Sequence, residues 1–188
     1  MKVGNQSIED DIVKEAKKML LESDVKSLNM SKLANKCNVA KATLYKMIGS
    51  KEDLLSIIAL DFYQESFELF FTSYIDLSSF VEIVNEGMLS LEKISIGKMR
   101  ILEQQIFREY PKIKQKVDLY IVKLENRVVK KLEEFQQKKI ILNDIDLRLL
   151  VELIKQTLVT SIESNLPDRE IKAKLVLLNK LVIRGLLN

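Results

Sequence analysis

Residues 29–48 read Asn29-Met-Ser-Lys-Leu-Ala-Asn-Lys-Cys-Asn-Val-Ala-Lys-Ala-Thr-Leu-Tyr-Lys-Met-Ile48, a pattern that predicts two short helices joined by a tight turn. Asn29 suits the cap of the first helix, because its side-chain oxygen can accept hydrogen bonds from the first free backbone N–H groups. Ala34 is small where the two helices cross. Asn38 falls in the turn, where we expect a positive φ that asparagine tolerates better than most residues. This is the spacing of a helix-turn-helix, whose second helix presents exposed residues to the major groove of DNA.

The charges of this region support the same interpretation. From Lys26 to Lys51 every charged residue is basic. A solvated helix face normally mixes signs, because opposite charges three or four residues apart stabilise it. A single-sign stretch therefore indicates a polyanionic partner, to which lysines bind by displacing counterions from phosphates. The alternative is a solvated face that binds nothing. The basic residues are Lys26, Lys32, Lys36, Lys41, Lys46 and Lys51.

Helical periodicity continues on both sides of this block. Apolar residues at helical spacing predict an amphipathic helix from Ser7, its expected cap, to about Ser23. The segment Ser50-Lys-Glu-Asp53 is similar to a capping box, and it opens a helix expected to reach about Phe71. Further helices are expected over residues 80–95, 97–109, from Pro111 onward, 144–164 with Asn143-Asp144 as cap, and 168–187.

The composition favours an all-α fold. The 188 residues include only five glycines and two prolines, too few for the turns of a β-rich fold. We expect about nine helices: a helix-turn-helix DNA-binding domain at residues 1–50, and a second helical domain at residues 51–188, to which the family resemblance described below assigns ligand binding and dimerisation. The sequence has no apolar signal segment and no apolar stretch long enough for a membrane helix, so we expect a cytoplasmic protein without membrane contact.

The same composition argues against an enzyme. The chain has no histidine, the commonest general base and metal ligand. Cys37 is the only cysteine, so an internal disulfide or a thiolate metal cluster is excluded, and we expect it to be a small buried residue. Adjacent acids such as Glu133 and Glu134 point in different directions on a helix. We therefore expect no catalytic residues, no cofactor and no metal.

Residues 8 to about 58 resemble the DNA-binding domain of the tetracycline-repressor (TetR) family. The motifs that carry the resemblance are Leu33-Ala34, Asn38-Val39, Lys41-Ala-Thr-Leu-Tyr45, Met47-Ile48 and Ser50-Lys-Glu-Asp-Leu-Leu55. The sequence departs from the family pattern at Asn38, where glycine is preferred, and at Ile48, where phenylalanine is preferred. Ala40 stands where a capping serine or threonine is usual, which should weaken the start of the second helix by about 1 kcal/mol.

The resemblance implies a set of DNA contacts. The second helix of the motif would face the groove or its edge, with Thr43 as the base reader through its hydroxyl or methyl group. The Tyr45 hydroxyl would bind a phosphate, and Lys51 would add charge at the next helix start. The alternative for Tyr45 is an aromatic of the core. The complete predicted DNA-binding set is Asn29, Ser31, Lys41, Ala42, Thr43, Tyr45, Lys46 and Lys51.

The last two expected helices are apolar on more than one face. A helix on the surface of a monomer needs only one apolar stripe, so the second stripe indicates packing against another copy in a two-fold four-helix interface. The predicted interface residues are Leu149, Leu153, Thr160, Leu177, Leu178 and Leu181.

The resemblance also implies a pocket for an apolar or amphipathic small molecule among the fifth, sixth and seventh helices. Methionines would adapt its shape. A filled core is the alternative for any of these residues. The predicted lining is Met88, Leu91, Met99, Glu103, Ile106, Phe107, Tyr120 and Leu124.

Together these features predict a dimeric bacterial transcription regulator, a repressor that a small effector releases from operator DNA. The alternatives are an activator, or a ligand-independent helical scaffold that binds nucleic acid or a protein through the basic module. Duplex RNA fits less well, because its deep, narrow major groove does not admit a helix. We expect the helix from Ser50 to be the only element linking the DNA-binding module to the second helical set, and hence the lever of regulation.

Overall fold

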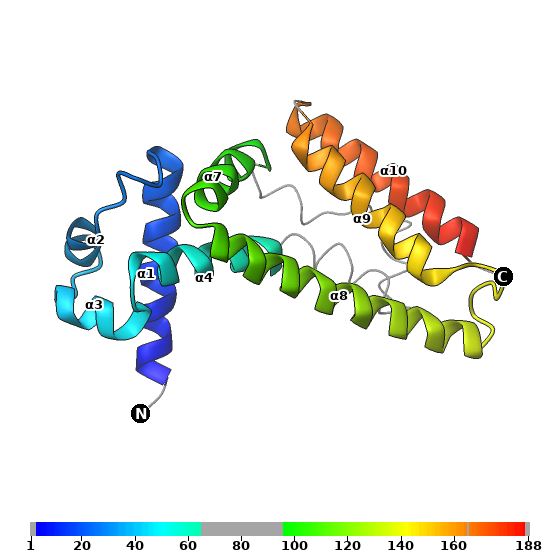
Figure 1. The fold of residues 1–188 in the computed structure, drawn as a ribbon, viewed down its shortest axis with the longest axis horizontal. Coiled ribbons are helices and arrows are strands. Elements are labelled where there is room, and N and C mark those ends of the chain that lie inside the picture. Colours follow the sequence, from blue (N-terminus) through cyan, green and yellow to red (C-terminus); the bar gives the residue numbers. More distant parts are fainter. Residues whose placement is uncertain (1–2, 65–95, 165, 187–188) are drawn as a thin grey trace. The chain divides into compact units, whose positions relative to one another are not determined.

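The computed structural model describes residues 3–64, 96–164 and 166–186, which form eight helices and no strand. The expected all-α fold class is confirmed. The chain divides into two compact units, both drawn in Figure 1. The first unit comprises residues 1–62 and 101–118, and the second comprises residues 63–100 and 119–188. The helix expected over residues 80–95 and the expected helix end near Phe71 lie outside the described residues.

Helix α1, Val3–Glu22, is the long element of the first unit. It buries Ile12 and Ala16 completely, and Leu20 is 2% exposed, which is the amphipathic stripe predicted from the spacing. The expectation that Ser7 caps this helix is wrong, because α1 begins at Val3 and Ser7 lies inside it with its side chain exposed. Serine is only mildly unfavourable in an exposed helix interior, so its presence does not fix a helix start.

Three short helices complete the N-terminal part: α2, Met30–Lys36; α3, Lys41–Ile48; and α4, Lys51–Tyr63. Helices α1, α2 and α3 contact one another, as Figure 1 shows. Leu33 of α2, Leu44 of α3 and Leu54 of α4 are all fully buried. The predicted pair of short helices between residues 29 and 48 is therefore confirmed.

Helix α7, Ile96–Glu109, contributes its residues from Ile101 onward to the first unit, and α8, Pro111–Gln137, contributes its first turns up to Asp118. Ile106 of α7 and Ile113 of α8 are buried at 1% and 0% exposure. The sequence predicts that the helix from Ser50 is the only link between the DNA-binding module and the second helical set. That interpretation is wrong, because α8 runs without a break from the first unit into the second.

The second unit contains the rest of α8 together with α9, Leu147–Glu163, and α10, Asp168–Leu186. Helices α9 and α10 pack side by side (Figure 1). The buried residues of these three helices recur at helical spacing, as in Val128 and Leu132 of α8, Ile154 and Leu158 of α9, and Ile171 and Leu175 of α10.

Two predicted boundaries in this half have different outcomes. The break at Tyr110-Pro111 is confirmed, because α7 ends at Glu109 and α8 begins at Pro111. The cap at Asn143-Asp144 is wrong: α9 begins at Leu147, and the Asp146 carboxylate accepts hydrogen bonds from the backbone N–H groups of Arg148 and Leu149 at 3.0 Å each.

Candidate nucleic-acid interface

The turn between α2 and α3 has the geometry that its sequence predicted. Asn29 Oδ1 caps α2 by accepting hydrogen bonds from the backbone N–H groups of Ser31 at 2.9 Å and Lys32 at 3.1 Å. Asn38 has a φ of 55°, and its neighbour Val39 donates its backbone N–H to the carbonyl of Ala34 at 3.0 Å. This is the Schellman arrangement that ends a helix sharply. It fixes the angle at which α3 leaves α2.

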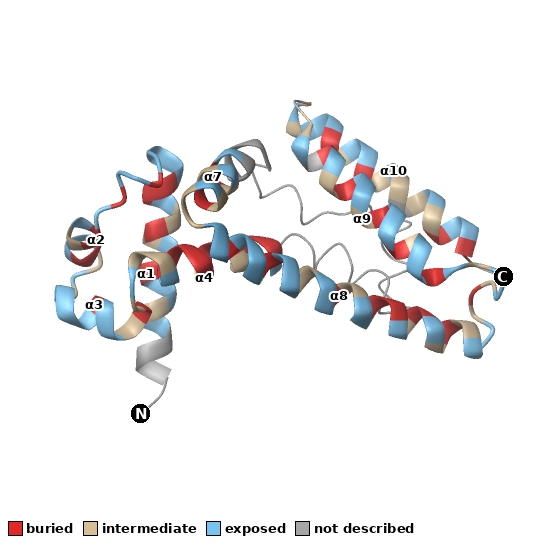
Figure 2. Ribbon diagram, in the orientation of Figure 1, coloured by how far each residue is buried: buried red, intermediate tan, exposed pale blue. Residues whose placement is uncertain are grey.

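Helix α3 presents most of its surface to solvent (Figure 2). Leu44 and Ile48 are buried and anchor it to the core, while Val39 and Met47 are half-buried. Ala40, at the start of α3, makes no side-chain cap, as expected. The exposed face holds Lys41, Ala42, Thr43, Tyr45 and Lys46.

Tyr45 is 41% exposed, so its interpretation as a core aromatic is wrong. The Lys41 ammonium lies 5.9 Å from the centroid of the Tyr45 ring, within the range of a cation–π contact. Since the two residues are one helical turn apart, this contact holds a cation and a phenol together on the exposed face of α3.

The six lysines of the basic stretch fall into two groups. Three of them contact other residues of the first unit, namely Lys26, Lys36 and Lys51. The other three make no ion pair with an acid of the described residues. Lys36 pairs with Glu15 of α1 at 2.8 Å, and this hydrogen bond raises the pKa of Lys36. Lys26 pairs with Glu109 of α7 at 3.9 Å. The acids that compensate these charges therefore come from distant parts of the sequence.

Lys51 is also engaged inside the unit. Its ammonium donates to the backbone carbonyl of Lys26 at 3.2 Å, and burial lowers its pKa against the opposing influence of Glu109 and Asp24.

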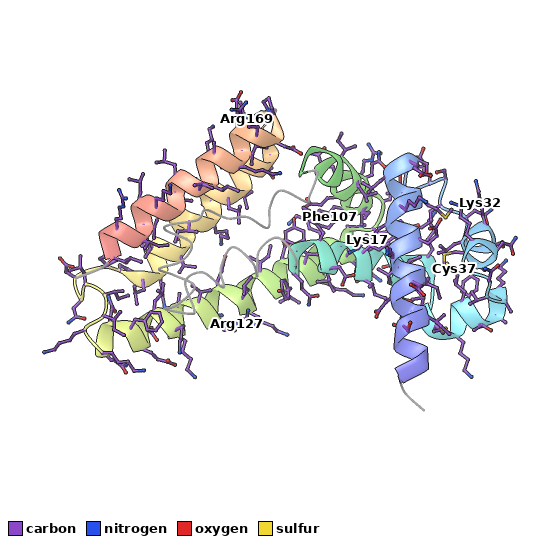
Figure 3. The ribbon with its side chains drawn as sticks, turned by 180° about the vertical axis from the view of Figure 1, so that it is seen from behind. Lys17, Lys32, Cys37, Phe107, Arg127 and Arg169 are labelled. Atoms are coloured by element: carbon purple, nitrogen blue, oxygen red, sulfur yellow. The ribbon has the colours of Figure 1, made fainter. Side chains whose placement is uncertain are left out.

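Three lysines of the stretch remain: Lys32 on α2, and Lys41 and Lys46 on α3. All are exposed, and no acid of the described residues pairs with them. Lys32, labelled in Figure 3, is not in the predicted DNA-binding set. Lys32 belongs to the run of like charges in the sequence, but it lies outside the motifs that carry the family resemblance.

The start of α4 carries a reciprocal cap, as the Ser50–Asp53 segment predicted. Asp53 accepts hydrogen bonds from Ser50, and its backbone N–H donates to Ser50 Oγ at 3.1 Å. Gly49 precedes this cap and lies outside the motifs that carry the family resemblance. It has a φ of 84°, and a Cβ placed there would lie 2.6 Å from Asp53 Oδ2. Only glycine fits this tight passage from α3 to α4.

The predicted interface residues of the second unit are largely exposed. The exposed fractions are 53% for Leu149, 57% for Leu153, 57% for Leu177 and 63% for Leu181. Thr160 is exposed and Leu178 is half-buried. Apolar side chains this exposed on two neighbouring helices are what a second partner would cover.

The predicted pocket residues are divided between the units. Glu103, Ile106 and Phe107 lie on α7 in the first unit, while Tyr120 and Leu124 lie on the part of α8 in the second unit. Met88 and Leu91 lie outside the described residues, and so does the side chain of Met99. Ile106 and Leu124 are buried, and the other described members are half-buried.

Two further observations concern the single cysteine and the hydropathy of the helices. Cys37 is half-buried rather than buried, and burial raises the pKa of its thiol. Within the described ranges, no helix has both the length and the apolar character that a membrane span requires.

Known proteins share both the sequence of this region and the fold of the chain. Residues 12–57 match the family model of bacterial regulatory proteins of the tetR family. A TetR-family transcriptional regulator from Mesorhizobium loti superposes with a TM-score of 0.71 at 12% identity, over 98% of each chain. The TetR-family transcriptional regulator PfmR from Thermus thermophilus gives a TM-score of 0.58 at 18% identity, over 93% of this chain and 97% of that one.

No curated protein matches the sequence. The family model nevertheless covers the whole helix-turn-helix, and the two solved structures share the fold along nearly the entire chain. Residues 12–57 therefore match bacterial regulatory proteins of the tetR family, and the chain as a whole shares the fold of two TetR-family transcriptional regulators.

Proposed function

We propose that the chain is a homodimeric repressor that binds operator DNA through α3 and is released by an apolar or amphipathic small molecule. The observation that carries the DNA part is the exposed face of α3, where Lys41 and Lys46 stand without acidic partners among the described residues. Unpaired cations on a helix that projects from its core are suited to phosphates at the edge of the major groove.

Each predicted contact has a role in this proposal. Thr43 reads a base edge, while Lys41, Ala42 and Lys46 face the groove or its edge. The Tyr45 hydroxyl binds a phosphate. At the start of α2, Asn29 uses its Oδ1 as cap, which leaves its amide NH₂ and the Ser31 hydroxyl as donors to the backbone of DNA. Lys51 contributes charge from α4, where its ammonium also donates a hydrogen bond to the Lys26 carbonyl.

The dimer and the effector complete the proposal. Leu149, Leu153, Leu177 and Leu181, with Thr160 and Leu178, pack against the same residues of a second copy, which places two recognition helices on one duplex. Residues 1–50 act as the DNA-binding domain, and residues 51–188 bind the effector and the second copy. The predicted pocket residues would admit the effector, and the protein acts in the cytoplasm.

The test is selection from a random-sequence duplex library by the purified chain. We expect enrichment of a palindromic sequence with half-sites about 34 Å apart or a multiple of that distance. Duplex RNA of the enriched sequence is the control, and it should compete weakly. Equal competition by RNA, or no enrichment, would instead favour the scaffold alternative. An activator would pass this test, and the position of the enriched site relative to its promoter distinguishes it from a repressor.

A further inference from the structure

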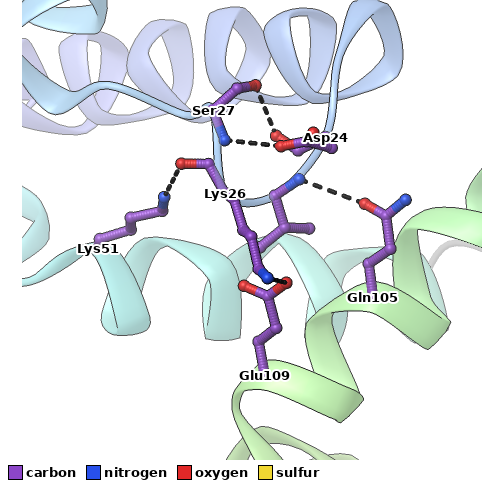
Figure 4. A network of polar contacts seen from close by, with 7 residues as sticks. Asp24, Lys26, Ser27, Lys51, Gln105 and Glu109 are labelled. Carbon is purple, nitrogen blue, oxygen red and sulfur yellow. Dashed lines mark hydrogen bonds and ion pairs between the residues drawn. The ribbon is translucent and has the colours of Figure 1, made fainter.

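The connection between α1 and α2, residues 23–29, is held by two helices that follow much later in the chain. The backbone N–H of Val25 donates to the side-chain Oε1 of Gln105 on α7 at 3.2 Å, and the Lys51 ammonium of α4 donates to the carbonyl of Lys26 at 3.2 Å (Figure 4). All of these residues belong to the first unit. The connection is therefore fixed on both sides by side chains from outside the helix-turn-helix.

The Gln105 bond is the stronger candidate for a specific role. Val25 is 0% exposed, so its N–H has little access to water if Gln105 is lost. By contrast, the neighbouring ion pair between Lys26 and Glu109 spans 3.9 Å, and the Lys26 side chain is 76% exposed, so solvent screens it. Gln105 thus satisfies, from α7, a buried backbone group of the connection.

The connection ends at Asn29, the cap of α2 and a member of the predicted DNA-binding set. A shift of residues 23–29 would therefore move the start of α2 against the DNA backbone. Specific binding requires both recognition helices of a dimer to hold fixed positions, whereas contacts with random DNA adapt to small displacements.

We propose that Gln105 is a positioning residue for operator binding: from α7 it fixes the α1–α2 connection and, through it, the start of the helix-turn-helix. This inference rests on the proposed DNA-binding function. It assigns to α7, which lies far from the motif in sequence, a part in DNA specificity.

The test compares three variants of the full chain: Gln105→Leu, Gln105→Glu and Gln104→Leu. The first removes the acceptor, and the second keeps it. The third makes the same replacement at an exposed neighbour on α7. The measured quantity is the ratio of affinities for the duplex that the unmodified chain enriches from a random library and for a scrambled duplex, together with the salt slope of each.

We expect Gln105→Leu to lower this ratio about tenfold, equivalent to about 1.4 kcal/mol, with an unchanged salt slope because the number of phosphate contacts stays the same. Gln105→Glu and Gln104→Leu should keep the ratio. If Gln105→Leu lowered both affinities equally, its role would be only structural, and the inference would be overturned. Equal ratios for the two leucine variants would overturn it as well.

Hydrogen exchange of the Val25 amide in the absence of DNA supplies an independent readout. Exchange should accelerate in Gln105→Leu and not in Gln104→Leu. If the amide is equally protected in both variants, the hydrogen bond does not hold the connection and the inference fails, whatever the DNA results. If the unmodified chain enriches no sequence, the proposed function fails and this inference fails with it, even with the exchange result as expected.

Discussion

The Asp53 carboxylate accepts two hydrogen bonds from Ser50, one from its backbone N–H at 2.9 Å and one from its hydroxyl at 2.7 Å. The Ser50 Oγ in turn accepts the backbone N–H of Asp53. This pair fixes the first turn of α4 directly after the recognition helix. Replacing Ser50 with alanine should lower the free energy of unfolding by about 1 kcal/mol, as measured by urea denaturation at neutral pH. Ser23→Ala, which removes only a hydroxyl bonded back to the Met19 carbonyl, should change it much less.

The same pair predicts a dependence on pH. Hydrogen bonds from Ser50, its side chain first and its backbone second, hold the pKa of Asp53 below its ordinary value. A carboxylate whose pKa is depressed on folding adds stability above its unfolded pKa, about 4, and loses it as the pH falls through the folded pKa. The stability difference between the unmodified chain and Ser50→Ala should therefore shrink below about pH 4. A difference that stays constant into acid would mean that the hydroxyl acts without the carboxylate.

Two turns of similar geometry allow a comparison of side chains with positive φ. Asn38 and Lys139 have φ values of 55° and 56°, and each follows a helix in a Schellman arrangement, with Ile140 donating its N–H to the Phe135 carbonyl at 3.0 Å in the second case. A positive φ raises the conformational free energy of lysine, as of most residues, whereas asparagine adopts it more readily. Lys139→Gly should raise the free energy of unfolding by up to about 1 kcal/mol, and Asn38→Gly should leave it nearly unchanged. Equal gains at both positions would contradict the argument.

Local chemistry explains which parts of the fold were predictable. Asn29 and Asn38 organise backbone groups that lie within five residues of themselves, so the neighbouring sequence is enough to predict their roles. The start of α9 is different, because Asn143, Asp144 and Asp146 are all suitable caps. The choice is made by contacts distant in sequence: Leu142 donates its N–H to the Leu186 carbonyl at 2.9 Å. Gln136 also donates to the carbonyls of Leu142 and Ile145, which keeps the segment before Leu147 out of the helix.

The charges of the candidate site could likewise be predicted from the sequence only in part. The run of lysines was evident in the sequence, but the pairing of Lys36 with Glu15 and of Lys26 with Glu109 depends on how α1 and α7 pack. Only the packed unit distinguishes these neutralised lysines from Lys32, Lys41 and Lys46. For the same reason the link between Gln105 and Val25, eighty positions apart, had no signal in the sequence.

Substitutions of the exposed lysines and of Thr43 should affect different properties of DNA binding: general affinity in the first case and sequence preference in the second. Lys32→Ala and Lys46→Ala should each weaken binding to the enriched duplex and to random DNA similarly, and reduce the salt slope by about one. Thr43→Val keeps a methyl group and loses the hydroxyl, so it should change sequence preference more than general affinity. Lys36→Ala is the control, because its charge is already paired with Glu15. If Thr43→Val weakens all sequences equally, Thr43 contacts phosphate rather than a base.

Charge introduced on the exposed face of α9 should break the proposed dimer. Leu153→Glu would bury a carboxylate against the second copy, so we expect monomers with much weaker operator binding, detected by light scattering at micromolar concentration. The matched control is Leu119→Glu on α8, since Leu119 is 64% exposed and lies outside the predicted interface. That variant should remain dimeric. A monomeric unmodified chain, or dissociation by both variants, would contradict the interface on α9 and α10.

Effector release must obey reciprocity between the two sites. A ligand frees the operator only if it binds better to a conformation whose recognition helices no longer match groove positions about 34 Å apart. The change has three covalent routes from the second unit, because α4, α7 and α8 each cross the boundary between the units as one helix. A coupling of about 1–3 kcal/mol would weaken operator binding roughly 5- to 150-fold, and operator DNA must weaken ligand binding by the same factor. Titration of a candidate ligand with and without the enriched duplex measures this factor, and a scrambled duplex at equal concentration is the control. A compound whose affinity is unchanged by the enriched duplex is not the inducer, however tightly it binds.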